Sequence, residues 1–282
     1  MGIENFKPTL WHGAILTEYE NSTVFASLAN RSLERDIRGY GDRVKINSMG
    51  DFAASNYVPG TVPYQNIIDT SQFLDIDQKK IVPVQLDSID NAQANPKVFG
   101  TMVQKMAYAM RDTIDAALGG TFSQGDLVSG TTGSPTSITS ANINSFLGSI
   151  GVAMDEDNIP TGNRVAVVPP WFAEKCRLGR IVKDTANSAY LAMNSYMGEM
   201  AGFSIFASNN VSKSGTDWYA PMFFNAFETI AFAEQLEEMI MLKDKDYPTY
   251  DFVNLVAVYG LKVVRSEALK YAYVEAGSES TI

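Results

Sequence analysis

The chain is poor in the side chains used for catalytic and metal chemistry, with one cysteine, Cys176, and one histidine, His12, in 282 residues. A single cysteine excludes an intramolecular disulfide and fits a reducing compartment. Catalytic triads and most zinc sites need histidine, so one chain cannot build a Cys/His metal cluster from this inventory. No local signature supports Cys176 as a nucleophile with His12 as its base. We predict instead a buried, inert thiol on an amphipathic helix.

Long apolar runs and basic residues are also scarce. No stretch approaches eighteen apolar residues, and Met1 to Thr9 lack the basic start and apolar core of a signal peptide, so no membrane association is expected. Lys plus Arg is 22 against 32 for Asp plus Glu, a net charge of −10, and the longest basic run is Lys79-Lys80. An acidic chain repels phosphate backbones, which argues against tight nucleic-acid binding through its net field. Synthesis in a cytoplasm fits these features.

Nucleotide-binding and calcium-binding motifs are incomplete. Gly39-Tyr-Gly41 begins like a dinucleotide loop, but Val44 stands where the third glycine is needed. Asp155–Asp157 and Asp244–Asp246 lack the glycine and the distant glutamate of a calcium loop, and we interpret both as solvated acidic turns. We therefore predict that the protein is not an enzyme and that it has no catalytic, cofactor-binding or metal-binding residues and no cofactor.

The residues that are present predict two amphipathic helices. Of all residues, 45% are hydrophobic, an ordinary globular composition. Asn95-Pro96 can start a helix, an apolar stripe at three- and four-residue steps follows, and Gly119-Gly120 ends it, so we predict a helix from Pro96 to about Leu118. Ser140 is the expected cap of the second helix. Its predicted apolar face consists of Ile143, Phe146, Leu147, Ile150 and Met154.

Several apolar stretches predict strands around these helices. They are Val165–Val168, Gly202–Ser208, Thr229–Ala233, Phe252–Tyr259 and Leu261–Val264, with a short helix around Trp171 and Phe172. Gly260 separates the last two stretches and predicts a bulge or bend. Residues 121–139, rich in Gly, Ser and Thr, predict a flexible connection. Helices and strands in mixed order, with no regular βαβ repeat, indicate an α+β protein.

The N-terminal third contains segments with little core of their own. Residues 1–40 predict an arm with one short helix at Val24–Ala29 that needs a partner surface. Arg43–Met49 and Ile81–Leu86 alternate between polar and apolar residues, so we expect these two strands to pair with each other. The residues between them have two prolines, one central glycine and scattered aromatics, which predicts a hairpin projecting from the body and resting on another subunit.

The order of these parts resembles the major capsid protein of tailed bacteriophages, in the Hong-Kong-ninety-seven-type fold. The matching segments are Leu74–Asp77 with Val82–Gln93, Met110–Asp115, Asn158–Pro160 with Asn163–Pro170, Gly202–Asn209, and Asp251 with Tyr259–Arg265. Ser266 departs from the family, where many members carry proline before Glu-Ala-Leu. The N-terminus leaves no room for a fused scaffolding segment, so we expect scaffolding to be a separate protein or the chain to begin at a processed end.

The resemblance implies a fold, a domain division and a function. The division is an N-terminal arm (1–40), an extended loop with its flanking strands (41–88), a peripheral domain with the spine helix (89–120 and 250–282) and an axial domain (121–249). The function is that of a structural subunit that self-assembles into the icosahedral capsid around a double-stranded DNA genome. The implied partners are further copies in hexamers and pentamers, a scaffolding protein, a portal and a decoration protein. DNA is enclosed without sequence-specific binding. The implied location is the virion, with assembly in the bacterial cytoplasm before maturation of the procapsid.

Three alternatives remain open from the residues. A phage tail or sheath protein would also self-assemble, but into rings or tubes. An encapsulin-type compartment shares the fold and would hold a cargo protein in place of DNA. A hydrolase or transferase with an unrecognised site would act as a monomer that turns over substrate.

Overall fold

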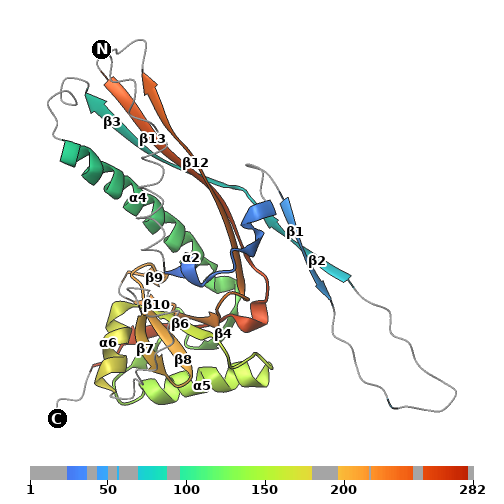
Figure 1. Ribbon diagram of the computed structural model, residues 1–282. Helices are drawn as coiled ribbons and strands as arrows, with labels where there is room; N and C mark the ends of the chain where they lie inside the picture. The colour runs from blue at the N-terminus through green and yellow to red at the C-terminus, as the bar shows by residue number, and fades with distance from the viewer. Residues whose placement is uncertain are drawn as a thin grey trace.

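The computed structural model describes residues 24–36, 43–49, 56, 69–87, 96–179, 196–215, 217–243 and 250–278. They form an upper body, in which long strands lie beside a long helix, and a lower body of short strands and helices (Figure 1). A two-stranded ribbon extends sideways from the upper body (Figure 1). The mixed order of helices and strands confirms the predicted α+β class.

The upper body is a three-stranded antiparallel sheet with helix α4 beside it (Figure 1). In spatial order its strands are β12 (Ile230–Lys243), β13 (Tyr250–Val263) and β3 (Gln78–Asp87). Helix α4 spans Pro96–Gly119, which confirms the predicted long helix.

Side chains of α4 and β13 share one buried cluster. Val253, Leu255 and Ala257 belong to it because alternate residues of a strand face the same side of a sheet. From α4, the members of this cluster are Met106, Ala107, Met110, Ile114 and Leu118. Burial of each large apolar side chain contributes about 1.5–3 kcal/mol to stability, so this contact holds the helix along the sheet.

The pairing of the ribbon differs from the prediction. Strand β1 (Arg43–Met49) pairs antiparallel with β2 (Asp69–Asp75), with Arg43 opposite Asp75 and Met49 opposite Asp69. Strand β3, which contains Ile81–Leu86, pairs with β13. The prediction that Arg43–Met49 pairs with Ile81–Leu86 is therefore wrong. Alternation shows that a strand is half-buried, but it carries no information about which strand lies beside it.

Gly260 marks a close approach of two backbones rather than the predicted bulge. Strand β13 continues through it, with Gly260 opposite Ala233, and the irregularity in this strand pair lies between Glu237 and Ile240. A Cβ at position 260 would overlap the carbonyl oxygen of Asp75, so a glycine is needed where the end of β2 crosses β13. Beside this crossing, a small buried cluster anchors the base of the ribbon, formed by Val44, Leu74, Ile76, Ala231, Ala233 and Val258.

The lower body contains a six-stranded and a four-stranded sheet, ordered β4-β14-β11-β6-β8-β7 and β5-β15-β10-β9. The strands of the first are β4 (Asp126–Ser129), β14 (Lys270–Ala272), β11 (Met222–Asn225), β6 (Arg164–Val168), β8 (Phe203–Ala207) and β7 (Tyr196–Met200). Those of the second are β5 (Thr136–Ile138), β15 (Val274–Ala276), β10 (Trp218–Tyr219) and β9 (Lys213–Ser214).

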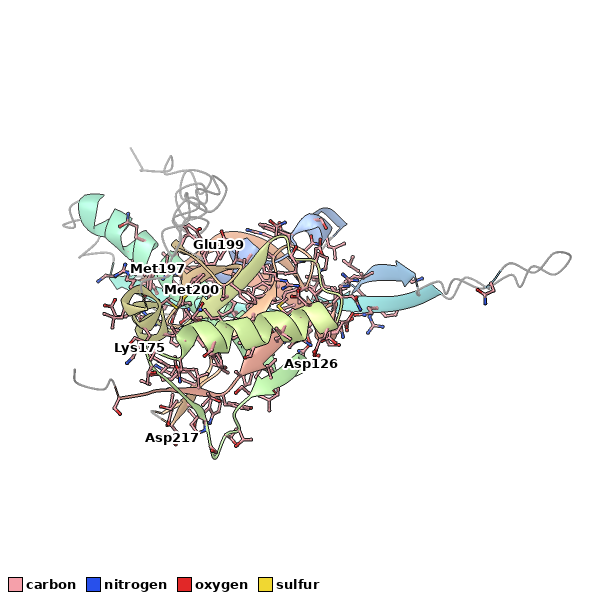
Figure 2. The ribbon with its side chains drawn as sticks, turned by 90° about the horizontal axis from the view of Figure 1, so that it is seen from below. Asp126, Lys175, Met197, Glu199, Met200 and Asp217 are labelled. Atoms are coloured by element: carbon pink, nitrogen blue, oxygen red, sulfur yellow. The ribbon has the colours of Figure 1, made fainter. Side chains whose placement is uncertain are left out.

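Helices α5 (Ile143–Glu156) and α6 (Pro170–Leu178) pack on these sheets. Figure 2 shows α5 across the lower body, with Asp126 and Lys175 labelled near its two ends. The five predicted apolar residues of α5 are all buried, which confirms its face. The predicted cap at Ser140 is wrong, because the helix begins after Asn142. The Asn142 side-chain oxygen accepts the backbone N–H of Thr139 at 2.8 Å and so fixes the preceding turn.

Residues 121–139 form regular structure, so the predicted flexible connection is wrong. They contain most of the short helix η2 (Gly120–Gln124) together with β4 and β5. Strand β4 pairs in parallel with β14, and β5 with β15. Both partners lie near the C-terminus, after the short helix η3 (Ser266–Ala268). Because these partners are so distant in the sequence, no local pattern predicts β4 and β5.

The described part of the N-terminal arm packs on its own subunit. Helix α2 (Phe25–Leu28) confirms the predicted short helix, and a second turn, η1 (Ser32–Asp36), follows it. Phe25 and Leu28 are buried in the cluster shared by α4 and β13. This part of the arm therefore finds its partner surface within the chain. The rest of the predicted arm, residues 1–23 and 37–40, lies outside the described residues.

Candidate functional site

The chemical inventory of the described residues contains no metal-binding group of three or more His, Cys, Asp or Glu side chains. Cys176 is buried on α6, as predicted, and burial raises the pKa of its thiol to about 12. The reactive thiolate therefore does not form near neutral pH. His12 lies outside the described residues. Within the described ranges, no helix is both long and apolar enough to cross a membrane.

Two carboxylates at the end of α5 neutralise buried cations. The Arg164 side chain is 6% exposed, and its Nη2 lies 2.7 Å from Oδ1 of Asp155. The buried Lys270 forms ion pairs with Asp126 at 2.8 Å and with Asp157. Burial alone would lower the pKa of Lys270, but hydrogen bonds and charge attraction from both carboxylates outweigh it, so this pKa is raised. Asp155 and Asp157 are solvent-exposed, which confirms the predicted solvated turn, and their ion pairs also fasten α5 to β6 and β14. The second predicted turn, Asp244–Asp246, lies outside the described residues.

Among the ribbon residues whose side chains the structure describes, 43–46 and 71–75, the buried ones are Val44 and Leu74, at the base. Val44, Leu74 and Ile76 contact the body there. Along the ribbon, Phe73 is 41% exposed, and the Arg43 guanidinium lies 4.9 Å from the centre of its ring. An isolated two-stranded ribbon is marginally stable in water. The exposed Phe73 and Arg43 are therefore candidates for contact with another surface.

One face of α4 is exposed and carries an aromatic residue stacked on a cation. Tyr108 is 59% exposed, and the guanidinium carbon of Arg111 lies 4.1 Å from the centre of its ring. The small residues Ala109 and Ala116 are exposed on the same helix. Tyr and Arg are enriched among residues that dominate binding at protein interfaces, so this face suits an extended segment of another chain.

Asp115 joins α4 to the N-terminal segment through a buried carboxylate. Its Oδ2 accepts the backbone N–H of Val24 at 2.9 Å, and its Oδ1 that of Ala26 at 3.5 Å. These N–H groups stand at the start of α2 and have no partner within that helix. Burial raises the pKa of Asp115 to about 6, although the two hydrogen bonds and the nearby Arg111 oppose the rise. Asp115 ends one of the segments that resemble the phage family, Met110–Asp115, but its contact with Val24 lies 91 residues away in the sequence.

Asp115 is expected to make the subunit less stable as the pH rises from about 4 to 7. Its pKa is higher in the folded than in the unfolded chain, so between these two pKa values the folded state binds more protons and stability falls with rising pH. The fall attributable to Asp115 is about 3 kcal/mol. In Asp115→Asn the amide oxygen still accepts the Val24 N–H, and this part of the pH dependence should vanish. Urea unfolding of both proteins between pH 4 and 7 measures it, and parallel curves would contradict the assignment.

Solved structures of phages and of a virus-like particle share this fold. The chain is similar to one in the structure of Mycobacterium phage Che8, with a TM-score of 0.70 and 23% identity over 89% of this chain and 90% of that one. The capsid structure of cyanophage P-SCSP1u gives a TM-score of 0.65 and 18% identity, covering 92% and 89%. The virus-like particle from Pyrococcus furiosus gives 0.58 and 9%, covering 94% and 98%. These likenesses confirm the predicted Hong-Kong-ninety-seven-type fold.

The sequence also matches a family model, whereas no curated protein matches it. The family is described as phage capsid protein, and the match covers residues 69–272. That range runs from β2 to β14 and includes the upper sheet, α4 and the six-stranded sheet of the lower body. Since the match spans well over half of its length, the chain belongs to the phage capsid protein family.

Proposed function

We propose that the chain is the structural subunit of an icosahedral capsid that self-assembles around the double-stranded DNA genome of a tailed bacteriophage. The match of residues 69–272 to the phage capsid protein family carries this proposal. The ribbon supports it, because it extends from the body with an exposed Phe73 and a closed shell surrounds every subunit with neighbours. Many weak contacts add through multivalency in such a shell. The net charge of −10 suits a wall along which packaged DNA slides.

In this proposal the regions keep their predicted roles with two changed boundaries. The arm is 1–40, and the extended loop with its flanking strands is 41–88. The peripheral domain contains residues 89–120 with both β12 and β13, since these strands pair along most of their length. The axial domain contains 121–229 together with β14 and β15, because both strands pair within the lower body.

The proposed partners follow from the shell. Further copies form hexamers and pentamers, and scaffolding, portal and decoration proteins act during or after assembly. DNA is enclosed without sequence-specific contacts. The subunit is made and assembled in the bacterial cytoplasm and ends in the virion. A structural role in the capsid requires no enzyme activity, and a compartment shell or a tail protein is not favoured by membership of the phage capsid family.

Sedimentation and nuclease protection test the proposed function. The chain is expressed alone and together with its neighbouring phage genes, and fast-sedimenting particles are treated with nuclease. We expect closed particles that protect DNA when the packaging proteins are present. Particles that hold a single cargo protein would indicate a compartment shell. A chain that stays monomeric under both conditions would contradict a structural role.

Replacing both His12 and Cys176 with alanine is expected to leave particle formation and infectivity within about twofold of wild type. Cys176 is buried and its thiol pKa is raised to about 12, so little thiolate forms at neutral pH, and removing one buried sulfur costs about 1 kcal/mol. Particle yield and plaque counts measure the effect. Loss of particles from a subunit that still melts cooperatively would instead reveal a metal or thiol function.

A further inference from the structure

Phe227 lies in the turn between β11 and β12 and combines two unfavourable features. Its φ is 66°, in the left-handed region, and the residue is 44% exposed. A bulky side chain in that region costs free energy, and such strain is typical of functional positions. Other described residues with positive φ have local explanations: Asn158 and Asn163 tolerate it, and Ala201 precedes Gly202 in the β7–β8 turn.

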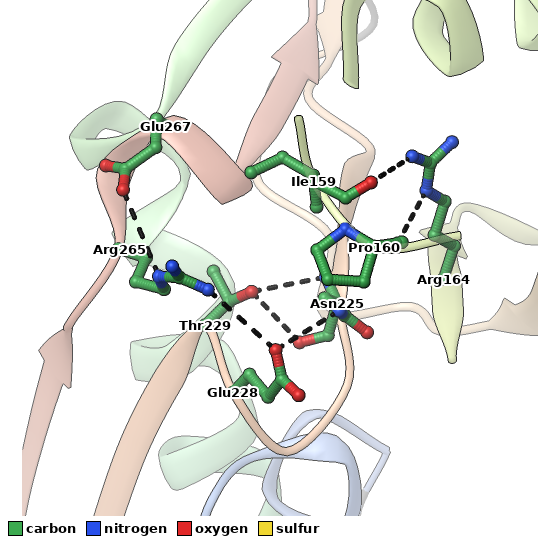
Figure 3. A network of polar contacts seen from close by, with 8 residues as sticks. All are labelled: Ile159, Pro160, Arg164, Asn225, Glu228, Thr229, Arg265 and Glu267. Carbon is green, nitrogen blue, oxygen red and sulfur yellow. Dashed lines mark hydrogen bonds and ion pairs between the residues drawn. The ribbon is translucent and has the colours of Figure 1, made fainter. Parts of the chain in front are cut away.

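The strained backbone is held by hydrogen bonds that do not involve the phenyl ring. The N–H of Phe227 donates to the carbonyl oxygen of Leu28 at 2.9 Å. The Thr229 hydroxyl donates to the carbonyl oxygen of Asn225 at 2.9 Å and accepts the N–H of Asn225 at 3.2 Å (Figure 3). These contacts fix the backbone of the turn and would form with any side chain at position 227. They give no reason for an aromatic one.

The residue that follows Phe227 in the chain belongs to a charged network at the surface. Glu228 lies 4.0 Å from Arg265, and Arg265 lies 4.0 Å from Glu267, all at the surface (Figure 3). Within the described residues, Phe227 belongs to none of the three buried clusters. An exposed aromatic side chain next to charged surface residues is typical of an interface anchor.

We propose that Phe227 anchors a contact with a second copy of this chain. This inference rests on the proposed function, because the shell supplies the second copy. The network that begins at the next residue, Glu228, holds two carboxylates and one guanidinium and is net negative, so the receiving surface should be apolar with basic neighbours. On the edge strand β3, Ile81 is 55% exposed and follows the exposed Lys79 and Lys80, the longest basic run of the chain. This segment, Lys79–Ile81, is the surface with the required chemistry.

Substitutions at position 227 give opposite expectations for folding and assembly. Phe227→Asn places a residue suited to the left-handed region, so the melting temperature of the subunit should not fall. The protein concentration needed for half-maximal assembly should rise at least about tenfold, as for loss of an interface anchor. Phe227→Tyr keeps the ring and should assemble like wild type. Calorimetry and sedimentation measure both properties.

The receiving surface is tested by a double-mutant cycle. Ile81→Asn should weaken assembly as Phe227→Asn does, and the double variant should be no weaker than the worse single one, because both changes remove one contact. Additive losses would overturn the pairing, and wild-type assembly of Phe227→Asn would overturn the anchor. A wild-type chain that forms no particles would instead contradict the proposed function itself.

Discussion

Replacing residues 50–68 with a two-residue Asn-Gly turn is expected to abolish closed shells while the subunit melts within about 3 °C of wild type. Met49 and Asp69 face each other at the end of the ribbon, so a two-residue turn joins them in register. Val44, Leu74 and Ile76 keep their burial at its base. We expect the removed residues to contact a neighbouring subunit in the shell, so the shortened chain should lose those assembly contacts. Calorimetry of the subunit and sedimentation of the assembly reaction measure the two effects.

A control replaces residues 50–68 with a Gly/Ser segment of the same length. This variant keeps the reach of the ribbon and removes its side chains, so it separates the two contributions to assembly. The deletion stops at residue 68 because a longer one, through Gln78, would also remove the buried Leu74 and Ile76. Normal shells from the shortened chain, or a subunit that no longer folds, would each refute a role between subunits.

Met106→Asp is expected to destabilise the subunit by about 3–5 kcal/mol and to leave little soluble protein. Met106 is 2% exposed and belongs to the cluster between α4 and the upper sheet. The variant loses the packing of a large side chain and places a carboxylate among apolar groups. Urea unfolding and the yield of soluble protein measure the loss.

The matched control is Ala109→Asp, on the exposed face of the same helix. It introduces the same side chain into the same helix and should cost less than about 1 kcal/mol, the difference in helix propensity. Equal losses in the two variants would mean that the helix tolerates no aspartate at either face. A soluble Met106→Asp subunit that assembles normally would show that the stripe does not face a core.

Local periodicity made the helices predictable from the sequence. The stripe of α4 and the five apolar residues of α5 recur at helical spacing, and that spacing is complete within each segment. The motifs that resemble phage capsid proteins likewise predicted the fold, because they occur along the chain in the same order as in that family. Cys176 was predictable as a buried thiol because its neighbours on α6 are apolar on one face.

Contacts between distant segments were not predictable in the same way. Strand β1 alternates in a manner that fits any half-buried partner, so its pairing with β2 could not be told from pairing with β3. Strands β4 and β5 depend on partners near the C-terminus. Asp115 binds the backbone of Val24, and a glycine is required at position 260 because the carbonyl oxygen of Asp75 lies against it. None of these partners lies within the window of a local pattern.

Electron cryo-microscopy of particles from cells that express the chain with its neighbouring phage genes tests the central claim most directly. The reconstruction should be a closed shell of icosahedral symmetry, with the β1–β2 ribbon of each subunit lying over the exposed face of α4, around Tyr108 and Arg111, in a neighbouring subunit. Open tubes or rings, or closed shells in which each ribbon contacts only its own subunit, would contradict it.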